Sequence, residues 1–244
     1  MRRWLSPFER KRRRRKRLIV SASFLVGLAI VHALDRPVVA YFHAAIGDTN
    51  AWERSDWVQL FRSIGFLPTW LLIAGALVLA DRVKGTAEDL WASGRRGIPL
   101  ALGAALAGLG AEVFKVLVSR ERPYVPRGED TDQLARLGEH VWHAPLSDLW
   151  MHYQAGLGMP SSHTAVAFGG AFMLARLCPR VGPIALVAAT GCGYTRVATG
   201  AHFLSDVYVA IWVAYAVVVF VSHRCPPTAV RDELARIEAA RTRW

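Results

Sequence analysis

Six apolar segments alternate with polar connections along the chain. They cover residues 18–34, 64–80, 98–118, 162–178, 183–199 and 203–221. Most are slightly shorter than the ~20 residues that cross a bilayer as a helix. Because lipid offers no hydrogen-bond partners to the backbone, such segments should be helical. The pattern therefore predicts an all-α fold, a polytopic membrane bundle with six transmembrane helices.

A strongly basic segment precedes the first apolar segment. Ten of the thirty lysines and arginines lie before residue 18. Basic residues beside a membrane span keep that end in the cytoplasm and attract anionic lipid headgroups. No nucleic-acid recognition motif accompanies the run, so we expect no nucleic-acid partner. A cleaved signal peptide would begin in the same way, but only a weak small-residue site at residues 31–33 is present.

The charges of the connections agree with a cytoplasmic N-terminus. The connections after the second and fourth segments and the C-terminal tail are basic, as the positive-inside rule requires. The two outer loops balance their arginines with acids: Asp35, Asp48, Glu53 and Asp56 in the first, and Glu121, Glu129, Asp130, Asp132, Glu139 and Asp148 in the second. We therefore predict a basic cytoplasmic segment at 1–17, a membrane domain at 18–223 and a cytoplasmic tail at 224–244.

Charged side chains at the ends of apolar spans are costly, so they indicate function. The third segment ends with Lys115, six further residues, and then Arg122 and Pro123. The fourth opens with Pro160, Ser161, Ser162 and His163. Unpaired N–H groups at a helix start form a natural anion site, and His163 stands beside it.

A third polar cluster joins the fifth and sixth segments. It contains Thr195 and Arg196, then His202 after five residues and Asp206 after three more. In a helix, positions 202 and 206 are one turn apart, so the carboxylate can orient the imidazole. The predicted topology brings all three clusters to the outer membrane face. Cations, hydroxyls, helix-start amides and two histidines at one boundary describe a phosphate site.

These three clusters, in this order, resemble the signature of the type 2 phosphatidic acid phosphatase (PAP2) family. That signature reads Lys-x6-Arg-Pro, Pro-Ser-Gly-His and Ser-Arg-x5-His-x3-Asp. Here Ser162 replaces the glycine and Thr195 replaces the first serine. Thr195 keeps a hydroxyl, whereas Ser162 adds a side chain where phosphate approaches closely.

The resemblance implies a membrane phosphatase that works through a phosphohistidine intermediate. His202, oriented by Asp206, attacks phosphorus, and His163 protonates the leaving oxygen. The phosphate-binding residues are Lys115, Arg122, Ser161, Ser162 and Arg196. The expected substrate is a lipid phosphate monoester or pyrophosphate, such as phosphatidate, phosphatidylglycerophosphate, polyprenyl pyrophosphate or a lipid A phosphate. The scheme needs no metal or other cofactor, and the site should face the periplasm or extracytoplasmic side of the plasma (inner) membrane.

Three other hypotheses remain open. The same signature resembles the vanadate-dependent haloperoxidases, although those are soluble proteins. A non-enzymatic protein that binds or transports a lipid phosphate would use similar cations. The outer loop at 124–159 carries His140, His143 and His152, which suggest a metal site, but we favour a cover over the pocket.

Glu112 is placed to pair with Lys115 across three residues.

Overall fold

The computed structural model describes residues 7–46, 49–84, 96–124, 136–149, 151 and 156–225. Within these residues the fold is all-α, as predicted, with no β-strand. The helices are α1 (Pro7–Ile46), α2 (Thr49–Glu53), α3 (Asp56–Ile64), α4 (Leu67–Lys84), α6 (Gly97–Val118), α8 (Ser162–Leu177), α9 (Gly182–Ala198) and α10 (Leu204–Arg224), with one 3-10 turn, η1 (Ser147–Leu149). Every apolar segment of the sequence forms a helix.

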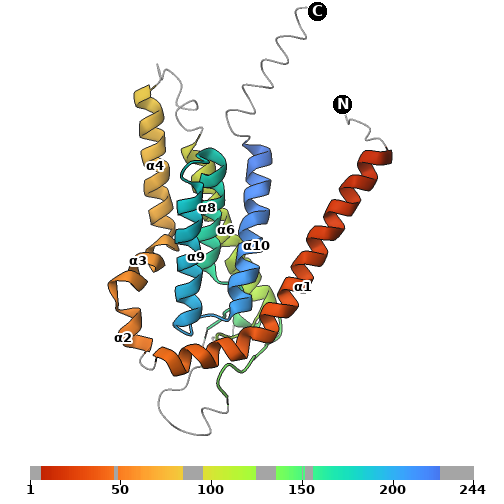
Figure 1. The fold of residues 1–244 in the computed structure, drawn as a ribbon, viewed down its shortest axis with the longest axis vertical. Coiled ribbons are helices and arrows are strands. Elements are labelled where there is room, and N and C mark those ends of the chain that lie inside the picture. Colours follow the sequence, from red (N-terminus) through yellow and green to blue (C-terminus); the bar gives the residue numbers. More distant parts are fainter. Residues whose placement is uncertain are drawn as a thin grey trace, which may run out of the picture.

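Helix α8 lies at the centre of the bundle, packed against α6, α9 and α10 (Figure 1). Small residues allow this packing. A Cβ atom on Gly169 of α8 would lie 2.6 Å from the Cβ of Ala107 and 2.6 Å from the carbonyl oxygen of Gly103, both on α6. The two backbones therefore approach as closely as small-residue interfaces permit. Helix α4 covers the outside of α6.

Among the residues that the structure describes, three helices are long and apolar enough to cross a membrane by themselves: α1 from Arg14 onward, α6 and α10. Helices α3 and α4 add a fourth candidate if they are counted as one span bent by 64°. Helices α8 and α9 have only 16 and 17 residues. Six transmembrane helices, the cytoplasmic position of both termini and the three-part division of the chain remain predictions; residues 1–6 and 226–244 lie outside the described part of the chain.

Helix α1 is longer than the sequence pattern predicted. It continues from the apolar segment to Ile46 and lies across the ends of α9 and α10 (Figure 1). Asp35, which was assigned to the first outer loop, is therefore inside this helix and fully buried. The assignment was wrong because the helix continues past the end of the apolar run at residue 34, where it packs against α9 and α10. In the folded chain Asp35 instead accepts hydrogen bonds from the backbone N–H (2.8 Å) and hydroxyl of Ser205.

The segment between α1 and α4 folds back onto the bundle as two short helices. Trp52 of α2 meets Trp57 of α3 edge to face, with ring centroids 4.7 Å apart. Phe61 of α3 fills the space above Gly191 of α9, where a Cβ atom would lie 2.2 Å from its ring. Helix α3 is thereby held against α9, and the next residue, Arg62, is brought to the polar end of the bundle.

Candidate active site

The three polar clusters of the sequence meet at one end of the helix bundle. The Ser162 hydroxyl donates a hydrogen bond to Glu112 of α6, which joins the first cluster to the second. The backbone N–H of Ser161 donates to the carbonyl oxygen of Asp206 at 3.2 Å, which joins the second to the third. The helices thus assemble residues that are up to 91 positions apart, from Lys115 to Asp206, into one site.

His202 and Asp206 form the most deeply buried part of this site. His202 lies in the short connection between α9 and α10 and is 2% exposed, while Asp206 is fully buried. The imidazole Nδ1 lies 3.4 Å from Asp206 Oδ2, which is within ion-pair distance but not aligned as a hydrogen bond. The same Oδ2 accepts the backbone N–H of Phe203 at 2.8 Å, which caps the start of α10.

The protonation state of His202 follows from its burial. Burial lowers the pKa of His202 to about 4, and the nearby positive charges act in the same direction. Asp206 opposes this effect because its negative charge favours the protonated ring. Burial prevails, so the imidazole is neutral at neutral pH and keeps a free lone pair, as a nucleophile requires.

His163 opens α8 beside the corner between α3 and α4. Its ring meets Phe66 edge to face with centroids 5.1 Å apart, and Gly65 packs against it so closely that a Cβ atom would lie 2.8 Å from its own Cβ. Its Nε2 atom is buried and has no hydrogen-bond partner among the described residues. Buried polar atoms normally have partners, so this nitrogen is suited to receive a ligand.

The predicted cations surround the histidines. Lys115 Nζ lies 2.9 Å from Glu112 Oε1, which confirms the expected pair. Arg196 is 6% exposed, and its buried Nε has no partner among the described residues. The charge of Arg122 acts on both Arg196 and His202, and the charge of Lys115 acts on His163, so all three cations lie near the two histidines.

The hydroxyl residues have different local partners. Ser161 is fully buried at the N-cap of α8, and its hydroxyl accepts a hydrogen bond from Thr164 at 3.1 Å. Thr195 donates its hydroxyl to the carbonyl oxygen of Cys192 at 2.8 Å, within its own helix. Ser162 turns its hydroxyl to Glu112. The departure from the signature at Ser162 therefore adds a contact to α6.

Sequence reasoning missed three charged residues at this end of the bundle: Asp35, Arg62 and Arg120. Arg62 of α3 acts electrostatically on both His163 and Arg196, which makes it a further cation at the site. Arg120 lies inside the first cluster, between Lys115 and Arg122, and is fully buried. A charged residue so close to an apolar span was a usable signal, but its partner is invisible in the sequence.

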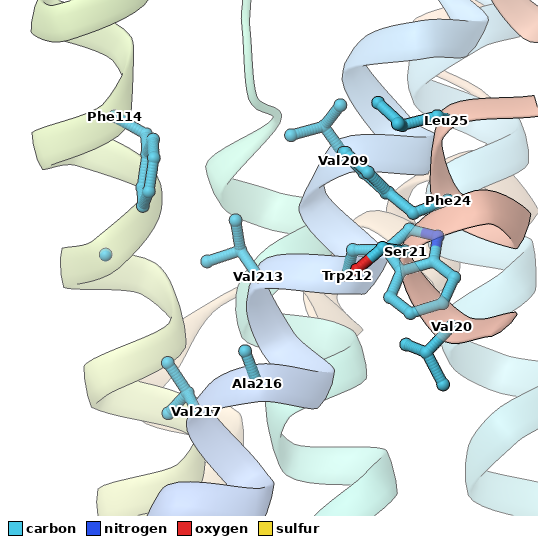
Figure 2. Close-up of a pocket in the computed structure, with 11 residues that line it drawn as sticks. Val20, Ser21, Phe24, Leu25, Phe114, Val209, Trp212, Val213, Ala216 and Val217 are labelled. Carbon is cyan, nitrogen blue, oxygen red and sulfur yellow. The ribbon is translucent and has the colours of Figure 1, made fainter. Parts of the chain in front are cut away.

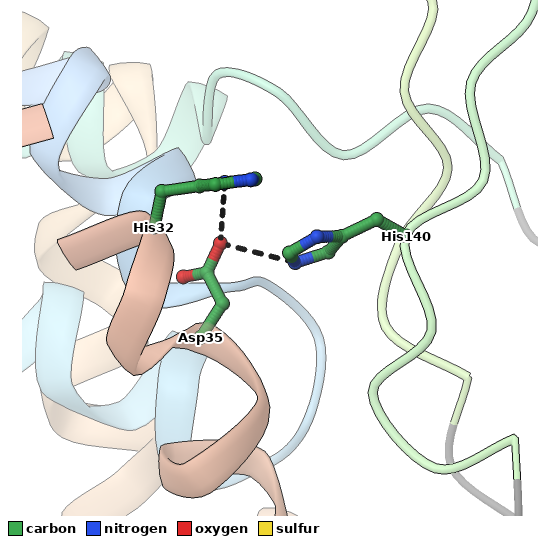
Figure 3. A group of neighbouring side chains, drawn as sticks. All are labelled: His32, Asp35 and His140. Atoms are coloured by element: carbon green, nitrogen blue, oxygen red, sulfur yellow. Dashed lines mark ion pairs between the residues drawn. The ribbon is translucent and has the colours of Figure 1, made fainter. Parts of the chain in front are cut away.

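A possible metal-binding group lies beside the site, formed by His32, Asp35 and His140 (Figure 3). Their ligand atoms lie within 4.8 Å of one another. However, Asp35 Oδ2 already accepts the Ser205 hydroxyl and lies 3.4 Å from the guanidinium of Arg120. A divalent cation there would meet this fixed positive charge, so we assign no metal to the group.

The remaining loop histidines do not make a second such group within the described residues. His143 Nε2 lies 2.7 Å from Glu121 Oε1. His152 lies outside the described part of the chain. Of the loop histidines considered from the sequence, His140 and not His143 thus lies in a group of potential metal ligands among the described residues.

Comparison with known proteins adds two findings. Residues 96–229 match the sequence model of the PAP2 superfamily. The structure is similar to the crystal structure of a transmembrane PAP2-type phosphatidylglycerolphosphate phosphatase from Bacillus subtilis, with a TM-score of 0.51 and 20% sequence identity over 84% of this chain and 94% of that chain. No curated protein matches the sequence. At this identity the structural likeness speaks for the fold alone.

Proposed function

This chain belongs to the PAP2 superfamily, and from that premise we propose that it is an integral membrane phosphatase acting on a lipid phosphate monoester or pyrophosphate. One observation carries the proposal. A buried, neutral His202 beside Asp206 lies in the same site as two groups whose buried nitrogens lack partners among the described residues, His163 and Arg196. Such groups are suited to bind a phosphate anion beside the imidazole, which then accepts the phosphoryl group.

In the proposed reaction, His202 attacks the phosphorus atom of the substrate. Because Nδ1 faces Asp206, the attacking atom is Nε2. A P–N bond forms while the bond from phosphorus to the leaving oxygen breaks, and His163 gives its proton to that oxygen. Water then attacks the phosphohistidine and loses a proton to His163, and the P–N bond breaks. Asp206 stabilises the cationic ring between the two steps, as the carboxylate of a catalytic triad does.

The phosphate oxygens are held by the cations and by the start of α8. Lys115, Arg122 and Arg196 bind the non-bridging oxygens as charge shifts in the transition state. Ser161 and the backbone N–H of Ser162 add hydrogen bonds at the helix N-terminus, where the dipole favours an anion. No step in this scheme requires a metal ion.

Glu112 has a supporting part in this scheme. Its carboxylate accepts hydrogen bonds from both Lys115 and Ser162. When phosphate enters, Lys115 exchanges this partner for a phosphate oxygen. Glu112 therefore keeps the lysine oriented and partly neutralised until the substrate arrives.

An apolar groove supports a lipid as the substrate. It has a volume of about 640 Å³ and lies between α1, α6 and α10 (Figure 2). Its wall includes Phe24, Phe114, Val209, Trp212, Val213 and Val217. Phe114 is the neighbour of Lys115, and Val209 follows Asp206 by less than one turn of helix. A hydrocarbon chain in this groove leaves its phosphate near the polar end of the bundle, which we place at the extracytoplasmic face of the plasma membrane.

A phosphate-release screen tests the proposal. Purified protein in chelator is given phosphatidate, phosphatidylglycerophosphate, a polyprenyl pyrophosphate and lipid A. We expect at least one to release phosphate, and rapid quench with labelled substrate to leave acid-labile phosphate on His202. Absence of release from all four lipids and from nitrophenyl phosphate refutes the phosphatase function. Label on His163 that survives His202→Ala reverses the assigned roles of the two histidines.

A further inference from the structure

A buried chain of charged residues extends from Asp206 to the first helix of the protein. Asp35, Arg120, Ser205 and Asp206 are each fully buried. Arg120 Nη1 lies 3.4 Å from Asp35 Oδ2, and Arg120 Nη2 donates to the carboxylate of Asp206. One guanidinium therefore bridges two carboxylates in the interior, where an unpaired charge is very costly.

The two oxygens of Asp206 have separate partners. Oδ1 accepts the hydrogen bond from Arg120, whereas Oδ2 faces the imidazole of His202 and accepts the N–H of Phe203. A carboxylate held at both oxygens cannot rotate about its terminal bond. Arg120 thus fixes the orientation in which Asp206 meets the ring of His202.

Arg120 is itself held at both terminal nitrogens of its guanidinium and by two aromatic rings. Its guanidinium carbon lies 4.6 Å from the ring centroid of Phe203 and 5.3 Å from that of Trp142, so it lies over two aromatic rings. Arg120 Nη2 donates to the hydroxyl of Ser205 at 2.9 Å. Because these contacts use a planar, forked donor, a lysine cannot reproduce them.

Asp35 holds the far end of the chain of charges. It accepts the backbone N–H and the hydroxyl of Ser205, the residue directly before Asp206, and the charge of Arg120. His32 and His140 lie against it at 3.4 Å and 3.3 Å (Figure 3). Asp35 belongs to α1, outside the residues that match the family.

The summed charge of the buried residues Asp35, Arg120 and Asp206 suits the proposed intermediate. Two carboxylates and one guanidinium carry a formal charge of −1, and the carboxylate of Asp206 faces His202. The imidazole becomes more positive when it bonds to phosphorus, and a low-dielectric interior strengthens the attraction between the two charges. The buried negative charge is thus placed to stabilise the ring during the reaction.

We propose that Asp35 and Arg120 are positioning residues for His202, acting through Asp206, so that the first helix is a working part of the active site. This inference rests on the phosphatase function proposed above. It assigns a role to Asp35 of α1 and to Arg120, which lies between Lys115 and Arg122 in the first cluster.

Asp35→Asn tests the inference because it keeps the shape of the side chain and removes its charge. We expect kcat to fall about 10- to 100-fold with little change in KM, since small misplacement of a catalytic group costs this much. Orthovanadate, which adopts the geometry of the transition state, should bind more weakly by a similar factor. If Asp35→Asn does not fold, Ser205→Ala removes the hydroxyl bridge while both charges stay, and the same loss is expected.

A double-mutant cycle separates positioning from a structural role. In an Asp206→Asn background the added Asp35→Asn substitution should change kcat by less than about twofold, because the group through which it acts is already altered. If the loss of kcat in the double variant equals the product of the two single losses, the inference is overturned. Wild-type kcat in Asp35→Asn also overturns it.

Asp81→Asn is the matched control. It removes the carboxylate of an ion pair with Arg96, at the opposite end of α6 from the site. This variant should lower the unfolding temperature and leave kcat unchanged. If the wild-type protein binds orthovanadate but hydrolyses no phosphate ester, the phosphatase function is wrong, while vanadate affinity in the same cycle still decides the positioning inference.

Discussion

Replacement of Gly158 by alanine places a methyl group against the carboxylate that orients His202. Gly158 lies in the segment just before α8, and its backbone N–H donates to the carbonyl oxygen of Arg120 at 2.7 Å. An added Cβ atom would lie 3.1 Å from Asp206 Oδ2, 3.1 Å from the carbonyl oxygen of Glu121 and 3.2 Å from the Cα of Arg122. Two of these three neighbours are backbone atoms, so the space is closed on those sides.

The expected cost follows from these distances. Contacts of 3.1 Å are a few tenths of an ångström too short for a carbon atom, so either the carboxylate or the segment around Gly158 must shift. Overpacking of this kind costs about 1–3 kcal/mol of stability. If a 1 Å misplacement costs about 100-fold in rate, a shift of a few tenths costs on the order of 5- to 10-fold. The carboxylate of Asp206 is held by Arg120 and by the N–H of Phe203. Relief of the short contact therefore disturbs either these hydrogen bonds or the segment that leads into α8, and both belong to the active site.

The assay is kcat/KM for phosphate release together with the unfolding temperature of the detergent-solubilised protein. Gly75→Ala serves as the control, because a Cβ atom at this position of α4 meets nothing within 4 Å. The control should keep full activity, and it should be as stable as the wild type or slightly more so, since alanine favours helix. Full activity and an unchanged unfolding temperature in Gly158→Ala refute the reasoning that the Asp206 carboxylate is confined.

Four further outcomes are expected. Activity persists in chelator and is inhibited by orthovanadate; complete loss that added metal restores contradicts the proposed chemistry. His163→Ala slows release of a lipid alkoxide by about 10²- to 10⁴-fold but slows release of nitrophenolate less, and equal losses show that His163 is not the proton donor. Ser162→Gly stays active because it keeps the backbone N–H, whereas a folded, inactive variant assigns the hydroxyl a role of its own. Burial lowers the pKa of His202 to about 4 from its ordinary value of 6.5, so the unfolded chain binds the proton more readily and stability is lost as the pH falls through this range. The unfolding temperature of His202→Asn should therefore depend less on pH between 6.5 and 4 than that of the wild type, and an identical dependence argues against a buried neutral ring.

The sequence alone predicted the helices and most of the candidate site residues, because both depend on local patterns. Apolar runs specify helices wherever the backbone must satisfy itself, and all six runs are helical in the structure. The pair of Glu112 and Lys115 was predictable because residues three apart in a helix are neighbours. His202 and Asp206 are also close, as their spacing predicted, but His202 lies before the start of α10 and not within a helix.

Helix ends and buried partners were decided by the tertiary structure. Asp35 looked like a loop residue since a carboxylate after an apolar run usually ends in water. Its backbone and hydroxyl partner, Ser205, is 170 residues away in sequence, and no local pattern records such a contact. Arg62 and Arg120 were missed for the same reason. Whether a charge near a span faces solvent or a counter-charge depends on which helices pack together. Such an ion pair stabilises the protein only after the bundle has formed, so the sequence does not reveal it.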